Sequence, residues 1–198
     1  MIEHLVSLLV HFADILGYIG IYFYMLLVGT FIPVPSEIVL IPAGYLSSIG
    51  KKSFFLLLLS GALGSLSGAL INYFLAKWLV QKYRHKELFQ KVIRFFNHHG
   101  KIAVFLAPLT PGLGQYISIP AGISHMPLRY FVPLTFSANL IWVGFMLLIG
   151  YIFGEGTAAK SAATLGSLVL LGFVILSATI YVYREVKKSS YEEITESS

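Results

Sequence analysis

Two apolar segments of this chain are long enough to cross a lipid bilayer, yet neither can form an uninterrupted helix. Residues 28–49 contain "IPVPSEIVLIPAG", and residues 102–124 read "IAVFLAPLTPGLGQYISIPAGIS". Proline removes a backbone donor and clashes with the preceding helical turn, so a break is predicted in each segment. The expected breaks lie at Pro33, Pro35, Pro42, Gly44, Pro111, Gly112, Gly114, Pro120 and Gly122.

The composition predicts an integral membrane protein. Hydrophobic residues make up 57% of the chain and charged residues 12%, with a mean hydropathy of +0.79, and ordinary soluble domains carry about twice that share of charge. Backbone left unpaired at membrane depth is tolerated only inside protein or beside a water-filled cavity. We therefore interpret both broken segments as re-entrant helical hairpins, which enter and leave the bilayer on the same side.

The remaining apolar segments predict four transmembrane helices, because a spanning helix uses about 20 apolar residues. Between the second and the third, residues 78–97 place apolar and basic side chains at helical spacing. This pattern predicts an amphipathic helix on an anionic membrane surface, with a solvated connector as the alternative. One all-α membrane domain is expected over residues 1–184, followed by a polar cytoplasmic tail at 185–198. The four predicted spans are 5–27, 54–76, 130–153 and 163–183.

The distribution of charge supports the hairpins. If both segments return to their own side, most basic residues share one face of the membrane, whereas two full crossings would split them. Basic residues mark the cytoplasmic side, so this topology places both termini in the cytoplasm. That side would carry Lys82, Arg84, Lys86, Lys91, Arg94, Lys101, Arg129, Arg184, Lys187 and Lys188, and the other Lys51, Lys52 and Lys160.

An internal repeat relates the two broken segments. A shift of 78 residues (120 − 42) aligns "IPAG" at 41–44 with "IPAG" at 119–122, and also Pro33 with Pro111. In the expected topology the two hairpins enter from opposite sides, so the copies are inverted. Inverted repeats of broken helices that meet near the midplane are typical of secondary transporters, whose unwound segments build the substrate site.

Residues 96–151 resemble the signature region of the DedA family, also called SNARE-associated or VTT-domain proteins. The resemblance is carried by "HG" at 99–100, "PG" at 111–112, "SIPAG" at 118–122, and Met126, Phe131, Thr135 and Trp142, and "FIPVPSE" resembles the first-hairpin motif. The match runs over most of residues 15–155. It implies a lipid translocase of the bacterial inner membrane, which moves undecaprenyl phosphate or a glycerophospholipid as a flippase or a scramblase.

The chain departs from the family pattern at charged positions. Many bacterial members carry two arginines where this chain has Pro108 and Gly114, and an acidic residue where it has Val28. Arginine offers a planar fork of donors that suits phosphate. Its absence favours a net-neutral zwitterionic phospholipid, or uncoupled scrambling, over an anionic polyprenyl phosphate.

Glu37, which is retained from the family motif, is the principal functional candidate. An ionisable group at membrane depth is costly, so it is interpreted as a proton-coupling group or a contact for a cationic headgroup such as ethanolamine. Capping of the helix that follows Pro35 is the structural alternative. The expected substrate-binding set is completed by the neutral groups of Ser36, Thr110, Gln115, Tyr116 and Ser118.

Other functions are less well supported by the residues. A lipid phosphatase would need a nucleophile such as Ser36 with a histidine base. The predicted spans and hairpins contain one histidine, His11. His98 and His99 lack the further ligands of a structural zinc site. No catalytic residue, metal, cofactor or nucleic-acid partner is expected. A scaffold that moves nothing remains open, and a homodimer is compatible with the small-residue helices but not specified by them.

Overall fold

The computed structural model describes residues 2–83, 87–110 and 114–154, and all regular structure in these ranges is helical. The predicted span at 163–183, the tail at 185–198, Pro111 and Gly112 lie outside the described residues. The elements are α1 (Ile2–Gly29), α2 (Glu37–Ser48), α3 (Phe54–Tyr83), α4 (Glu87–Leu106), the 3₁₀ turns η1 (Ala107–Leu109) and η2 (Gly114–Ile117), α5 (Ser118–Ile123) and α6 (Leu128–Phe153).

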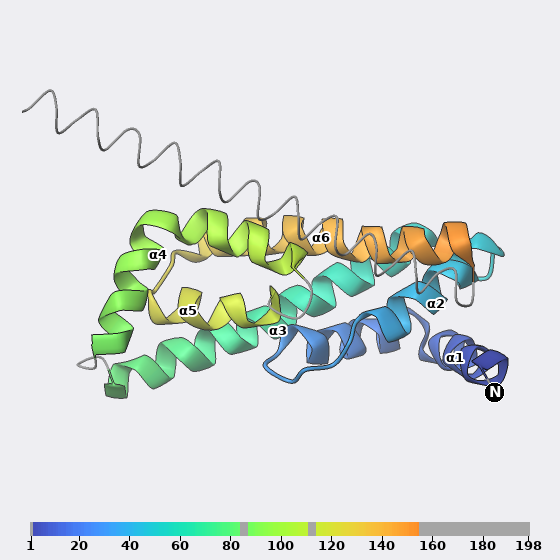
Figure 1. The fold of residues 1–198 in the computed structure, drawn as a ribbon, viewed down its shortest axis with the longest axis horizontal. Helices are drawn as coiled ribbons and strands as arrows, with labels where there is room; N and C mark the ends of the chain where they lie inside the picture. The colour runs from blue at the N-terminus through green and yellow to red at the C-terminus, as the bar shows by residue number, and fades with distance from the viewer. Residues whose placement is uncertain (1, 84–86, 111–113, 155–198) are drawn as a thin grey trace, which may run out of the picture.

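Helices α3 and α6 run the length of the bundle, with α1 and α2 toward one end and α4 and α5 toward the other (Figure 1). Both are long and apolar enough to cross a membrane, over Phe54–Trp78 and Leu128–Phe153, as the sequence predicted. Only 39% of each apolar window is buried inside the protein. Most of this apolar surface therefore faces outward, where lipid rather than water accommodates it.

The first predicted span, 5–27, is wrong as a straight crossing. Helix α1 bends at Gly17, whose backbone angles (φ 56°, ψ −164°) are far from helical. Just before the bend, Asp14 forms an ion pair with Lys52 at 3.1 Å, next to the start of α3. Residues 18–29 then provide roughly 18 Å of helix, well short of a bilayer core of about 30 Å. The side of the membrane on which the amino terminus lies stays a prediction.

Two breaks interrupt the α-helices of the bundle. The first, residues 30–36, separates α1 from α2 and contains Pro33 and Pro35, as predicted. The second lies between α4 and α5, and its described residues, 107–110 and 114–117, contain the 3₁₀ turns η1 and η2 and Gly114. Pro42, Gly44, Pro120 and Gly122 were predicted to break helices, but they lie inside α2 and α5. The two breaks exist, whereas their re-entry into a membrane stays a prediction.

Position within the helix explains why these prolines are tolerated. Pro120 is in the first turn of α5, where a backbone N–H has no intrahelical acceptor in any case. Pro42 lies in the second turn of α2, so it removes one internal hydrogen bond that tertiary packing offsets. The glycines that follow serve close helix crossings. A Cβ on Gly44 would collide with the backbone of Leu147, and one on Gly122 with the backbone of Tyr73.

The predicted amphipathic helix at 78–97 is divided between two elements. Its first residues complete α3, which ends at Tyr83, and α4 begins at Glu87. Helix α4 then continues to Leu106, past the predicted start of the second hairpin at residue 102. Phe96, Gly100 and Val104 are all buried. Their spacing of four residues forms one stripe along α4, which carries the helix on toward the middle of the bundle.

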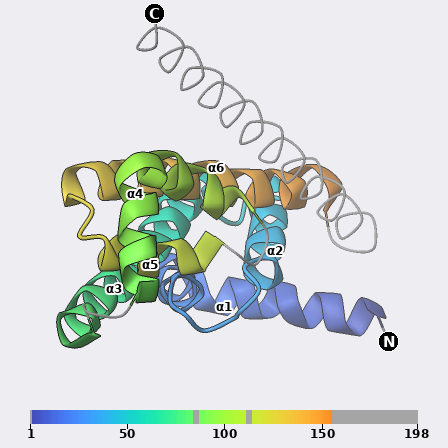
Figure 2. The ribbon, with the colours of Figure 1, turned by 60° about the vertical axis from the view of Figure 1, so that its left-hand side comes forward.

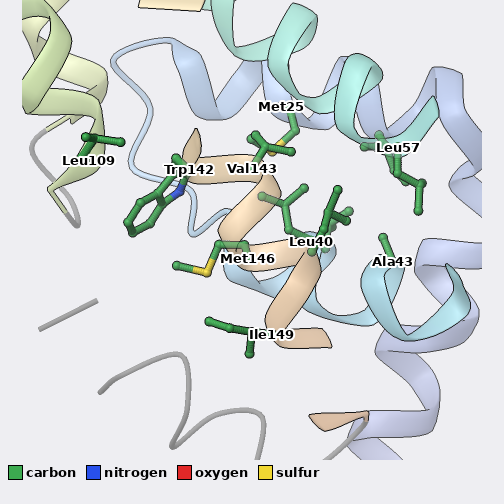
Figure 3. Packing of buried hydrophobic residues seen from close by; sticks show 12 residues of the cluster. Met25, Leu40, Ala43, Leu57, Leu109, Trp142, Val143, Met146 and Ile149 are labelled. Carbon is green, nitrogen blue, oxygen red and sulfur yellow. The ribbon is translucent and has the colours of Figure 1, made fainter. Parts of the chain in front are cut away.

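Each short helix packs on the long helix of the other repeat. Helix α2 lies against α6, and α5 lies against α3, with few contacts between α2 and α3. Figure 2 shows the same arrangement from a second direction. The shift of 78 residues relates α2 to α5 and α3 to α6. The short helix of each copy therefore packs on the long helix of the other copy, an arrangement called here the exchange of short helices. In the larger buried cluster, Leu40 of α2 converges with Val143 and Met146 of α6 (Figure 3).

Candidate functional site

A cavity of about 350 Å³ lies where the two breaks meet. Both breaks contribute to its wall, and α1, α3 and α6 complete it. This volume is at the lower end of the range for small-molecule pockets, and it suits a polar headgroup rather than a whole lipid.

The wall from the first break is fixed by two hydrogen bonds. The indole Nε1 of Trp142 donates to the hydroxyl of Ser36 at 3.2 Å, and the hydroxyl of Tyr24 donates to the carbonyl of Pro35 at 2.9 Å. Ser36 is 6% exposed, and its side chain makes no capping bond to α2. Glu37 follows as the first residue of α2 and is half-buried in the cavity wall. A carboxylate is electrostatically favourable at a helix amino terminus.

The wall from the second break is held by local side-chain bonds. The hydroxyl of Thr110 donates to the carbonyl of Ala107 at 2.6 Å, which closes the turn η1. The hydroxyl of Ser118 donates to the carbonyl of Gln115 at 3.0 Å. Gln115 and Tyr116 lie in η2 and are half-buried in the cavity wall. Ser118 itself is 1% exposed and lies behind that wall.

Asn72 of α3 joins the two breaks. Its side-chain Nδ2 lies 3.3 Å from the carbonyl of Gly29, at the edge of the first break. The same nitrogen lies 3.2 Å from the hydroxyl of Ser118 and 3.4 Å from the carbonyl of Gln115, both in the second half. The residue is 2% exposed. These bonds tie together backbone groups at the edges of the two breaks.

One face of α6 forms a wall that sequence reasoning did not assign to the site. Thr135, Asn139 and Trp142 all line the cavity. They stand at positions i, i+4 and i+7, the spacing of a single helix face, and this spacing could have revealed them. Thr135 is 2% exposed, and its hydroxyl has no hydrogen-bond partner among the described residues. Asn139, which lies between Thr135 and Trp142, is half-buried and borders the cavity.

The internal repeat places two related side chains on opposite walls. Glu37 and Gln115 are separated by 78 residues (115 − 37), the same shift that aligns the two "IPAG" motifs. Both line the cavity, one from each break. The cavity therefore presents a carboxylate from the first copy and its neutral amide counterpart from the second.

Comparison with known families adds a match over the helices and breaks that build this cavity. The VTT domain matches residues 34–152, more than half of the chain. The chain belongs to the VTT-domain family. The resemblance to DedA proteins is thereby confirmed, and a membrane protein is established.

Curated relatives extend the match over nearly the whole chain. An alkaline phosphatase-like protein of Lactococcus lactis is 28% identical, with 91% of this chain and 94% of the relative covered. The uncharacterized membrane protein YkoX of Bacillus subtilis is 30% identical, with coverage of 94% and 86%. Undecaprenyl phosphate transporter A of Bacillus subtilis is 28% identical, with coverage of 86% and 89%. No solved structure matches the chain.

In this VTT-domain protein, the predicted substrate-binding residues gather at one place. Ser36, Glu37, Thr110, Gln115 and Tyr116 all line the cavity, and Ser118 supports it from behind. Their role in binding stays a prediction.

Three positions at which the sequence resemblance implies charged residues in many family members also line this cavity. They are Val28, at the expected acidic position, and Pro108 and Gly114, at the expected arginine positions. Among the described lining residues, Glu37 is the only one with a charged side chain. A bare phosphate anion would therefore meet one carboxylate and no cation, and the charge would oppose its binding.

The arrangement gives no support to hydrolysis, despite the name of the Lactococcus relative. Ser36 would be the nucleophile, yet no histidine occurs among the described residues that line the cavity. The hydroxyl of Ser36 instead accepts a hydrogen bond from Trp142. Within the described ranges, no three side chains of the His, Cys, Asp or Glu type gather as metal ligands would.

Proposed function

We propose that this protein moves a phosphate-containing lipid across the bacterial inner membrane, with the headgroup passing through the cavity between the two breaks. The observation that carries this proposal is that one cavity is lined by both copies of the repeat. Two halves that exchange their short helices can open the same cavity toward either side. Relatives named undecaprenyl phosphate transporter support a role in lipid transport.

The orientation follows from charge. Lys77, Lys101 and Arg129 belong to the end of the bundle that carries α4 and α5, whereas Lys51 and Lys52 lie at the opposite end. Because basic residues mark the cytoplasmic side, the end with α4 faces the cytoplasm in this proposal.

The lining favours a headgroup that carries an amine as well as a phosphate. Glu37 can pair with an ammonium group, and the hydroxyl of Thr135 can donate to a phosphate oxygen. A zwitterionic phospholipid such as phosphatidylethanolamine satisfies both groups, whereas a polyprenyl phosphate satisfies only the second. Protonation of Glu37 during transport would couple headgroup movement to a proton gradient.

The test is lipid movement in proteoliposomes that contain the full chain. Fluorescent phosphatidylethanolamine, phosphatidylglycerol and a polyprenyl phosphate are compared at two imposed proton gradients. We expect phosphatidylethanolamine to move fastest and Glu37→Gln to slow it at least about tenfold, since the charged contact is worth about 1.5–3 kcal/mol. Asp14→Asn is the matched control, because this carboxylate pairs with Lys52 outside the cavity.

The repeat supplies a second variant. In the exchange Glu37→Gln/Gln115→Glu, the carboxylate moves to the related position on the opposite wall. Recovery of transport by this double variant is expected if the charge of the cavity is what matters. Absence of movement for every lipid, by a protein that is folded and inserted, would refute transport and leave the scaffold. Equal rates for Glu37→Gln and wild type would refute the role of the carboxylate.

A further inference from the structure

A second cavity, of about 310 Å³, lies at the end of the bundle that carries α4 and α5. Its wall comes from α4, from the short connection between α5 and α6, and from the first residues of α6. Its lining includes Lys101, Ser124, His125 and Tyr130. It shares no lining residue with the central cavity.

Two cations lie near the ring of Tyr130: Lys101, which lines the cavity, and Arg129, which precedes Tyr130 in α6 and is not itself a lining residue. The ammonium of Lys101 lies 4.1 Å from the centre of the Tyr130 ring, and the guanidinium carbon of Arg129 lies 4.9 Å from the same centre. Within the part of the chain that the structure describes, neither cation has a carboxylate partner. At the opposite end of the bundle, by contrast, Lys52 is neutralised by Asp14. The second cavity therefore presents positive charge that remains available to an anion.

The backbone at this cavity is constrained in an unfavourable conformation. His125 has φ of 53°, and no other non-glycine residue in the described ranges has a positive φ. Such a conformation persists only where the surroundings hold it, and it occurs preferentially at ligand sites. Here the hydroxyl of Tyr73 donates to the carbonyl of Met126 at 2.6 Å, and the amide of His125 donates to the carbonyl of Gly122 at 3.1 Å. These bonds hold the imidazole in the cavity wall.

Exposed apolar side chains occur on the helix ends at this side of the bundle. Leu128 follows the lining residue Pro127 and is 40% exposed, and Trp78, near the end of α3, is 70% exposed. Tryptophan is enriched at the boundary between membrane and water, and lysine and arginine extend their charges toward that boundary. A lipid whose headgroup occupies the second cavity would have apolar protein surface beside its chains.

We propose that the second cavity binds the phosphate of an anionic phospholipid headgroup at the cytoplasmic surface. Lys101 and Arg129 supply the charge that pairs with the phosphate, while the hydroxyl of Ser124 donates to the carbonyl of Ala121 at 3.0 Å and so shapes the wall. Cations that the central cavity lacks are thus present at the surface. Helix α5 connects the two sites, and its six residues, Ser118 to Ile123, correspond to about 9 Å. Binding at this site does not require that the proposed transport takes place.

The experiment measures lipid binding to the purified full chain by native mass spectrometry. Phosphatidylglycerol and phosphatidylcholine are titrated separately, and inorganic phosphate is added as a competitor to separate a lipid site from a free-phosphate site. The test variants are Lys101→Gln, Arg129→Gln and their combination. Lys51→Gln is the matched control, because it removes an equally exposed lysine at the other end of the bundle.

We expect the double variant to weaken phosphatidylglycerol binding at least about tenfold, and Lys51→Gln to change it less than about twofold. Lys101→Arg, which keeps the positive charge, should bind phosphatidylglycerol as the wild type does. Equal losses for Lys101→Gln and Lys51→Gln would overturn the proposal, because binding would then follow net charge alone. Displacement of the lipid by millimolar phosphate would assign the site to free phosphate and would also overturn it. Asp14→Asn should bind phosphatidylglycerol as the wild type does, because this carboxylate pairs with Lys52 and lines neither cavity. Binding is measured without lipid movement, so a failure of transport and a failure of this site give different results.

Discussion

Replacement of Asn72 by alanine should destabilise the fold more than any other single polar substitution near the central cavity. Its Nδ2 carries two hydrogens and has three acceptors within 3.4 Å, so two bonds at a time are formed. Interhelical hydrogen bonds in membrane proteins are worth about 0.6 kcal/mol on average and up to about 1.7 kcal/mol. The loss is therefore about 1–3 kcal/mol. The carbonyl of Gln115 keeps its bond from Ser118, whereas that of Gly29 loses this partner.

The assay is unfolding of the purified chain in mixed micelles by increasing fractions of denaturing detergent, followed by far-ultraviolet circular dichroism. Asn139→Ala is the matched control, because this asparagine also borders the cavity but makes no hydrogen bond among the described residues. We expect Asn139→Ala to stay within about 0.5 kcal/mol of wild type. If Asn72→Ala is as stable as the control, the bridge between the two breaks does not contribute to the fold, and the reasoning is refuted.

Two further predictions concern helix crossing and the unpartnered hydroxyl. Gly44→Ala should lower the free energy of unfolding by about 1–3 kcal/mol, because its Cβ would meet the backbone of Leu147. Gly144→Ala should be nearly neutral, because its Cβ would meet only a side-chain methyl at 3.5 Å. The same unfolding assay compares the two variants. Thr135→Val should leave stability unchanged or raise it, since a buried hydroxyl without a partner is removed, yet it should slow phosphatidylethanolamine movement several-fold in proteoliposomes. Equal transport by Thr135→Val and wild type would exclude this hydroxyl from headgroup contact.

The long helices and the breaks were predictable because each depends on local chemistry. An apolar run such as that in α3 has few alternatives to a spanning helix. Two prolines separated by one residue, Pro33 and Pro35, leave little helical freedom. The repeat was visible in the sequence because both copies keep the same Pro-Ala-Gly motif. The glycine of each motif lies where two helices come so close that a larger residue would collide with backbone. The exchange of short helices between the copies was not visible, since it is a property of packing rather than of either segment.

The errors arose where tertiary contacts decide the local structure. Whether a proline ends a helix depends on its distance from the helix start, and Ser36, which precedes α2, is bonded to Trp142, 106 residues away in the sequence. Near the bend at Gly17, Asp14 likewise pairs with the distant Lys52. Neither contact can be read from the neighbouring sequence.

The distribution of charge between the two cavities gives each a separate electrostatic task. In the two proposals, Lys101 and Arg129 attract the phosphate of an anionic phospholipid at the cytoplasmic surface, whereas Glu37 in the centre pairs with the amine of the transported headgroup. Arginines in the centre would hold a phosphate strongly at the point where it must be released toward either side. With neutral side chains there and the cations moved to the surface, the phosphate is attracted toward the bundle but not trapped within it. Conduction and transport both require binding that is strong enough for access and weak enough for release.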